Sequence, residues 1–211
     1  MSKARTSDTI QTARSRYTWG FSVIKRLSVR VKPSCLAVWL CFFVFDPSVY
    51  TLLVLAAILL HEMGHLFWLF LFSVPRVQVI FSAFGAEMNY DGCFLSHKQQ
   101  MFLSLGGVTV NLLTALACLP FQNVHTEFLA VCSLCLAVLN LLPIKGLDGG
   151  RALEAFLLCK MELSKALLCL RRLSLFFLFL LFGLSFVLLA ASGFNFSLLL
   201  FTLYLSLSIL R

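Results

Sequence analysis

Residues 49–73 read VYTLLVLAAILLHEMGHLFWLFLFS, an apolar stretch with ionisable side chains in its second half. About 20 apolar residues suffice for a helix to cross the roughly 30 Å hydrocarbon core of a bilayer, so this stretch predicts a membrane-spanning helix. It nevertheless contains His61, Glu62 and His65. Ionisable groups at the centre of a bilayer are costly, at about 2.5–3.5 kcal/mol each on insertion scales for Arg, Lys and Asp. These three residues therefore predict a functional site inside a membrane span.

The composition of the whole chain agrees with a membrane protein. Of the 211 residues, 60% are hydrophobic and only 12% are charged, and the mean hydropathy is +0.94. A soluble domain is about half apolar and about a quarter charged. The net charge is +8, but the basic residues lie at the ends of apolar segments. Membrane topology explains this placement better than nucleic-acid binding does, so we expect no nucleic-acid partner.

The apolar segments predict an all-α polytopic membrane protein with about six transmembrane helices. The first segment is short and ends at Asp46 and Pro47, which favours a tilted or partly interfacial helix. A basic cytoplasmic tail, residues 1–33, precedes the membrane domain, residues 34–211. The predicted spans are 34–45, 49–73, 101–119, 127–143, 173–192 and 195–210.

Two stretches between the spans differ from membrane helices. Residues 77–91 mix β-branched and aromatic residues around Gly85, which predicts two short strands joined by a turn. Open strand edges cannot face lipid, so this small membrane-associated β-hairpin must lie at the interface or line a cavity. Residues 151–170 predict a helix along the cytoplasmic face, with Lys160 and Lys165 on its polar side.

The basic residues predict the orientation of the chain. With six spans, both termini and the loops 74–100 and 144–172 share one side of the membrane, and that side holds all 17 Lys and Arg residues. The opposite loops carry Asp46 and Glu127. Because Lys and Arg are enriched in cytoplasmic loops, we expect both termini to be cytoplasmic in a multi-pass protein.

The spacing of His61 and His65 predicts a metal site. Residues four apart lie on one face of a helix, so both imidazoles can reach one ion. Zn²⁺ accepts imidazole nitrogen at about 2.0–2.1 Å. Glu62 lies next to this face and can take a proton from water without being a ligand. Hydrogen bonding between helices is the simpler alternative for these polar residues, but it does not explain their combination.

A catalytic zinc requires a third protein ligand, for which Asp148 is the strongest candidate. It lies in residues 140–151, NLLPIKGLDGGR, where Pro143 ends or kinks the fourth span. Glycines at 146, 149 and 150 permit tight backbone turns, so Asp148 is expected at the mouth of a broken helix. An ordinary turn is the alternative for an Asp before two glycines. Other candidate ligands are Glu87, Asp91, His97 and Glu154.

The two motifs together resemble the site-2 protease family (peptidase M50) of intramembrane zinc metalloproteases. That family carries HExxH in one span and N-x-x-P-x-x-x-L-D-G in a later one, which match His61–His65 and residues 140–149. The resemblance implies one Zn²⁺ per chain held by His61, His65 and Asp148. It also implies that Glu62 is the general acid and base and that Asn140 positions the substrate. The family's hairpin, similar to residues 77–91, is thought to hold substrate as an added strand.

Within this family, the chain is most similar to the sporulation branch (stage IV sporulation protein FB-like). The shared features are a six-span layout, a short first span that leads directly into the HExxH span, and no PDZ domain between the spans. Some members of the branch carry a cytoplasmic nucleotide-sensing CBS domain after the last span, and we expect none in this chain. The resemblance implies a bacterial cell, mother-cell or forespore membrane. It implies cleavage of a membrane-embedded or membrane-associated precursor, such as a sigma factor precursor in sporulation, and control by regulatory membrane proteins.

One family feature is altered, and one other function stays open. The family's G-P-x-x-N motif is matched by Gly107 and Asn111, but Val108 replaces the proline, which weakens any role for Asn111. A membrane metal-binding protein or transporter without hydrolytic activity could use the same histidines. Paired broken helices in duplicated halves are typical of transporters, whereas here only one half carries the candidate metal ligands. Metal binding alone would also not need Glu62.

Overall fold

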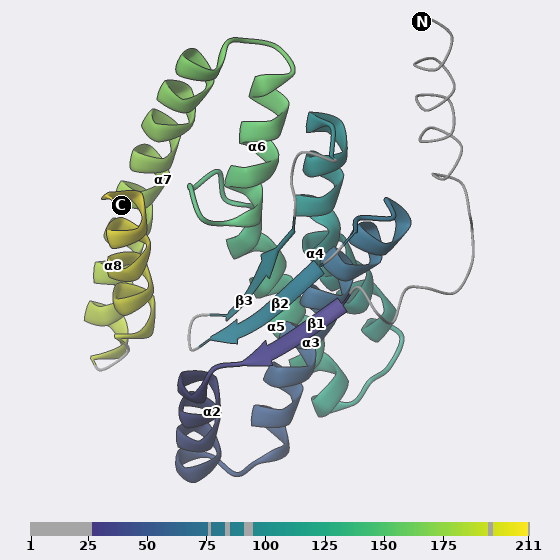
Figure 1. The fold of residues 1–211 in the computed structure, drawn as a ribbon. Coiled ribbons are helices and arrows are strands. Elements are labelled where there is room, and N and C mark those ends of the chain that lie inside the picture. Colours follow the sequence, from purple (N-terminus) through teal and green to yellow (C-terminus); the bar gives the residue numbers. More distant parts are fainter. Residues whose placement is uncertain (1–26, 76, 83–84, 91–94, 194–195, 211) are drawn as a thin grey trace, which may run out of the picture.

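The computed structural model describes residues 27–75, 77–82, 85–90, 95–193 and 196–210 (Figure 1). Most of the basic tail, residues 1–26, lies outside the described residues. Helices dominate, and one small sheet accompanies them. In chain order the elements are β1 (Leu27–Val31), α2 (Pro33–Phe45), α3 (Val49–Leu71), β2 (Val77–Ser82), β3 (Gly85–Asn89), α4 (His97–Cys118), α5 (Val124–Leu141), α6 (Asp148–Leu158), α7 (Leu163–Ser192) and α8 (Ser197–Leu210).

Four of these helices, α3, α4, α5 and α7, are long and apolar enough to cross a membrane. They correspond to four of the six predicted spans. The other two predicted spans are the shorter apolar helices α2 and α8. A helix of 13 residues such as α2 rises only about 20 Å, less than the roughly 30 Å of a hydrocarbon core. The structure thus supports an integral membrane protein with at least four candidate spans.

Helix α4 lies at the centre and packs against α3, α5 and α6. Its approach to α3 depends on two glycines that face each other, Gly64 in α3 and Gly106 in α4. A Cβ atom added to either residue would collide with the backbone of the other. Small residues at such crossings let membrane helices approach closely. The glycine within the HExxH sequence therefore brings α4 next to the two histidines.

The sheet has three strands, one more than the predicted hairpin. Strands β2 and β3 pair antiparallel, with Gln78 opposite Asn89 and Ser82 opposite Gly85, which agrees with the hairpin. Strand β1 pairs parallel to β2, with Leu27 opposite Val77 and Val31 opposite Phe81. The residues of β1 belong to the segment predicted as a polar tail. Only Leu27, Val29 and Val31 mark its alternation, and its partner lies about 50 residues later in the chain.

The sheet is attached to the helices by a small apolar core. Its buried members come from the end of α3 and the residues after it, from β2, and from α4 and the residues before it, and they are Leu69, Val74, Val77, Val79, Leu95 and Leu103. Val77 and Val79 alternate with more exposed residues along β2, as expected when one face of a strand is buried. This packing holds the sheet beside α3, the helix that carries the histidines (Figure 1).

Residues 151–170 form parts of two helices, so the prediction of one surface helix here was wrong. Helix α6 ends at Leu158, and α7 begins at Leu163 and continues to Ser192. No proline or glycine lies in the connecting residues Cys159–Glu162, so the sequence carries no strong signal for the break. Helix α7 consequently begins ten positions before the predicted span and forms a hairpin with α6 (Figure 1).

Candidate metal centre

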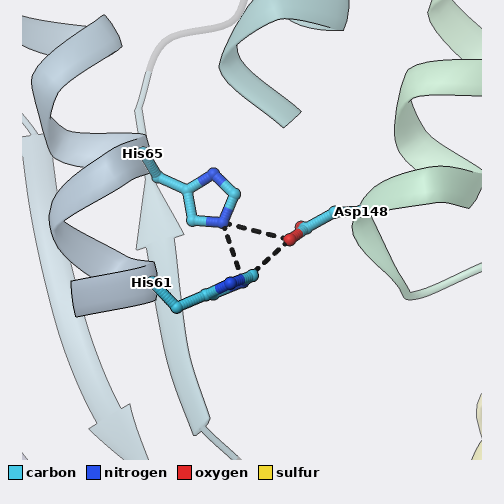
Figure 2. A group of neighbouring side chains, drawn as sticks. All are labelled: His61, His65 and Asp148. Carbon is cyan, nitrogen blue, oxygen red and sulfur yellow. Dashed lines mark hydrogen bonds and ion pairs between the residues drawn. The ribbon is translucent and has the colours of Figure 1, made fainter. Parts of the chain in front are cut away.

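Helix α3 presents His61 and His65 on its buried face, toward α4 and α6 (Figure 2). The two residues are one turn apart, and their ring centroids are 4.9 Å apart. Only 7% of His61 and 9% of His65 are exposed. The predicted helical spacing therefore places both imidazoles at one point inside the helix bundle.

Asp148 reaches the same point because the chain turns sharply after α5. That helix ends at Leu141, just before Pro143, and Gly146 takes a positive φ of 102°. Ser174 of α7 fixes the turn: its hydroxyl accepts a hydrogen bond from Lys145 N at 2.9 Å and donates one to Pro143 O at 3.2 Å. Asp148 then opens α6 and is only 6% exposed.

The two glycines after Asp148 have a different role from the one predicted. Both lie within α6, and neither has a positive φ. Instead, a Cβ atom on Gly149 would collide with the backbone of Leu141, and one on Gly150 with that of Ile144. The glycines therefore permit close packing of α6 against the end of α5, which sets the position of Asp148.

The three side chains form a compact triangle of potential metal ligands (Figure 2). Asp148 Oδ2 lies 2.9 Å from His61 Nε2 and 3.1 Å from His65 Nε2, and the two Nε2 atoms are 3.2 Å apart. Zinc with bonds of 2.0–2.1 Å separates tetrahedral ligands by about 3.3 Å. Two imidazole nitrogens and one carboxylate oxygen are a donor set typical of catalytic zinc. Both the atoms and their spacing fit the ion.

The Nδ1 atoms of both histidines point away from the triangle toward helix α4. His65 Nδ1 lies 2.8 Å from the backbone oxygen of Leu103, to which it can donate. His61 Nδ1 lies 3.3 Å from the side-chain amide of Asn111. Between these contacts lies Gly107, where an added Cβ would lie 2.5 Å from His65 Nε2 and 2.6 Å from His61 Cε1. Only glycine leaves room for both rings at this position.

The electrostatic surroundings of Asp148 favour an anion. Burial would raise the pKa of its carboxyl, but hydrogen bonds and charges from His61 and His65 lower that pKa below its usual range. The N-terminus of α6 also favours negative charge at its first residue. Asp148 therefore offers the triangle an ionised oxygen, as a divalent cation requires.

Glu62 and Asn140 lie next to this centre in the sequence but are not members of the triangle. Glu62 is half-buried in α3, and the charges of His61, His65, Asp148 and Arg151 act on its carboxylate. Asn140 is half-buried near the end of α5, and its Nδ2 donates to the backbone oxygen of Leu136, one turn earlier. The roles of both residues stay predictions.

The other candidate ligands do not join the triangle. Glu87 is exposed in β3 and forms an ion pair with Lys32 at 3.8 Å. His97 is exposed at the start of α4, and Glu154 lies in α6. Asp91 lies outside the described residues. Within the part of the chain that the structure describes, His61, His65 and Asp148 are the group able to hold a metal.

Asn111 contacts the centre although its altered motif predicted at most a weak role for it. It is fully buried, and its amide contacts His61 although 50 positions separate the two residues. The altered G-P-x-x-N motif was its one signal. Leu103 carried none, because its contribution is a backbone carbonyl.

Comparisons with known proteins agree with this centre. Residues 123–181 match the model of peptidase family M50. The chain is 38% identical over 109 residues to Rip2, a candidate zinc metalloprotease of Mycobacterium tuberculosis strain H37Rv, and 37% identical to Rip2 of strain Erdman. Each alignment covers 46% of this chain and 41% of the relative, so the chain spans less than half the length of the curated relatives it matches.

The fold also has a solved counterpart. The site-2 protease from Methanocaldococcus jannaschii superposes with a TM-score of 0.62, covering 90% of this chain and 92% of that one, at 19% identity. Residues 123–181, which match the family model, include α5 and α6, and Asp148 at the start of α6 lies next to the two histidines. The chain therefore resembles peptidase family M50 over residues 123–181 and has the fold of the solved site-2 protease, and its His61, His65 and Asp148 form a group that could hold a metal ion such as zinc.

Proposed function

We propose that this protein is an intramembrane zinc metalloprotease that cleaves membrane-embedded or membrane-associated proteins near the cytoplasmic side. The observation that carries the proposal is the buried triangle of His61, His65 and Asp148 with Glu62 beside it in α3. A zinc ion held there would act as a Lewis acid on the peptide carbonyl and on the attacking water.

Glu62 supplies the proton transfers of the reaction in this proposal. It follows His61 directly in α3, and it is not among the three residues of the triangle. As a general base its carboxylate takes a proton from the attacking water, and as a general acid it gives that proton to the leaving amine. Together with water, Glu62 thus accounts for the proton balance of hydrolysis.

The sheet gives the substrate a place to unfold. A substrate helix shields its own carbonyls, so the peptide must become extended before attack. Strand β2 is paired on both sides, which leaves the outer strands β1 and β3 for strand addition. Either outer strand could receive the peptide, and Asn140 would then position it beside the triangle.

The membrane arrangement belongs to the same proposal. The short helices α2 and α8 complete six crossings, and both termini lie in the cytoplasm, on the side that holds the basic residues. A sigma factor precursor in sporulation is the substrate that the resemblance to the sporulation branch favours. Regulatory membrane proteins would then control access to the site.

The replacement Glu62→Gln tests the function. It keeps the size of the side chain and removes the base, so cleavage of a co-expressed membrane-associated precursor should fall about 10²–10⁴-fold. Zinc content of the purified protein should stay near one ion per chain. Cleavage is measured from the size shift of the precursor on a gel, and metal content by atomic absorption.

Glu154→Gln in α6 is the matched control, because Glu154 lies outside the triangle. It should cleave at the wild-type rate. Equal cleavage by wild type and Glu62→Gln would refute the catalytic assignment. A metal carrier would instead transport zinc with either residue at position 62 and would give no cleavage product with any variant.

A further inference from the structure

The side chain of Asn111 is buried in an unusual way. The residue lies in the middle of α4 and has an exposed fraction of 0%. Its Nδ2 lies 3.3 Å from His61 Nδ1, while its Oδ1 is buried and has no hydrogen-bond partner. A buried polar atom without a partner costs about 1–3 kcal/mol, so this oxygen calls for a physical reason.

The chemistry of a histidine ligand supplies the reason. A neutral imidazole carries one proton, and the nitrogen that binds a metal must be the other one. Because Nε2 of both histidines faces the triangle, each Nδ1 must carry the proton and needs an acceptor. For His65 this acceptor is the backbone oxygen of Leu103, at 2.8 Å. For His61, Asn111 is the side chain that lies at Nδ1.

A carboxamide can serve either tautomer of His61, because a rotation of 180° exchanges its oxygen and nitrogen. With Nδ2 toward the ring, the amide donates to Nδ1, and the ring proton moves to Nε2, where it closes the metal position. With Oδ1 toward the ring, the amide accepts from Nδ1–H, and Nε2 keeps its lone pair. Only the second orientation is compatible with a metal on Nε2.

We infer that Asn111 is a positioning residue of the metal centre and that its Oδ1 accepts the Nδ1 proton of His61. The bond holds the ring in the tautomer that binds zinc and fixes its orientation against α4. This inference rests on the proposed zinc site. Gly107, one turn before Asn111, leaves the space in which the two rings lie, so one face of α4 shapes the centre without providing a ligand.

Two substitutions separate the acceptor from the rest of the side chain. Asn111→Leu keeps a similar volume and removes both polar atoms, and Asn111→Asp keeps an acceptor oxygen and removes the amide donor. Partners of histidine ligands typically contribute 10–100-fold to metal affinity. Zinc affinity, measured by competition with a chromogenic chelator in detergent, should therefore fall about 10–100-fold in Asn111→Leu and only a few-fold in Asn111→Asp.

Thr114→Val is the matched control, since it removes a polar group one turn further along α4 whose hydroxyl donates only within that helix, to Val110 O. It should bind zinc as wild type does. Circular dichroism and size-exclusion chromatography establish that each variant is folded.

A zinc affinity of Asn111→Leu equal to that of wild type would overturn the inference. An equal loss of zinc affinity in Asn111→Leu and Asn111→Asp would also overturn it, because an acceptor oxygen at position 111 would then not support zinc binding. Failure of the wild-type protein itself to bind zinc would refute the proposed function instead.

Discussion

At the scale of single residues, Asp148 joins the two halves of the candidate metal centre. The histidines share one helix, whereas Asp148 comes from α6, 87 positions after His61. Replacement by alanine removes the anionic candidate ligand and leaves the two imidazoles. We expect Asp148→Ala to hold well below one zinc per chain after dialysis against a weak chelator, as measured by atomic absorption.

Glu154→Ala provides the comparison, because it removes a carboxylate from the same helix outside the triangle. It should retain zinc at the wild-type level. Full occupancy in Asp148→Ala together with loss in Glu154→Ala would show that a different carboxylate completes the centre.

Residues were predictable where the signal is local. The i, i+4 spacing of His61 and His65 places both side chains on one face of any helix. Asp148 was a candidate ligand because of the proline and glycines around it. Asn111 was not, because its contact with His61 depends on how α4 crosses α3. That crossing depends in turn on Gly64 and Gly106, whose close approach no single helix reveals.

At the scale of elements, the same distinction separates the predicted helices from the sheet. Long apolar runs made α3, α4, α5 and the membrane part of α7 predictable, since length and composition decide such helices. Strand β1 is formed by its parallel pairing with β2. This contact is non-local, and the five residues of β1 alone do not predict it. The break between α6 and α7 contains no proline or glycine that would predict it. Ser174 of α7 forms hydrogen bonds with residues 143 and 145, a non-local contact that helps to position α7.

The glycines of α6 give a prediction at this scale. Gly149→Ala would push α6 away from the end of α5, where its Cβ would meet the backbone of Leu141. Overpacking of this kind costs about 1–3 kcal/mol, and it also moves Asp148. We expect a lower midpoint of thermal unfolding in detergent, followed by fluorescence, and a reduced zinc affinity.

Gly183→Ala is the matched control in α7, because a Cβ atom there meets nothing within 4 Å. Alanine is favoured over glycine inside a helix by about 0.5–1 kcal/mol, so this variant should be at least as stable as wild type. An unchanged midpoint and zinc affinity in Gly149→Ala would show that α6 can shift without cost and that Asp148 is held by other contacts.

At the scale of the whole molecule, the distribution of charge supports the proposed topology of six crossings. All 17 basic residues lie in segments that six crossings would place on one side, and the described residues contain four helices long enough to cross a membrane and two shorter apolar ones. In this proposal the connection between α4 and α5 faces the outside, and the connection between α6 and α7 faces the cytoplasm. Because the two connections carry opposite predictions, they can be compared within one experiment.

We expect Gln122→Cys, between α4 and α5, to react with a membrane-impermeant maleimide in intact cells. Lys160→Cys, between α6 and α7, should react only after the membrane is opened. Both residues are exposed, so a lack of reaction reflects the membrane and not burial. The background is a variant whose eight native cysteines are replaced by serine or alanine. Reaction of Lys160→Cys but not Gln122→Cys in intact cells would show that the topology is inverted. Reaction of both would show that the two connections lie on the same side, which contradicts a single crossing by α5 between them.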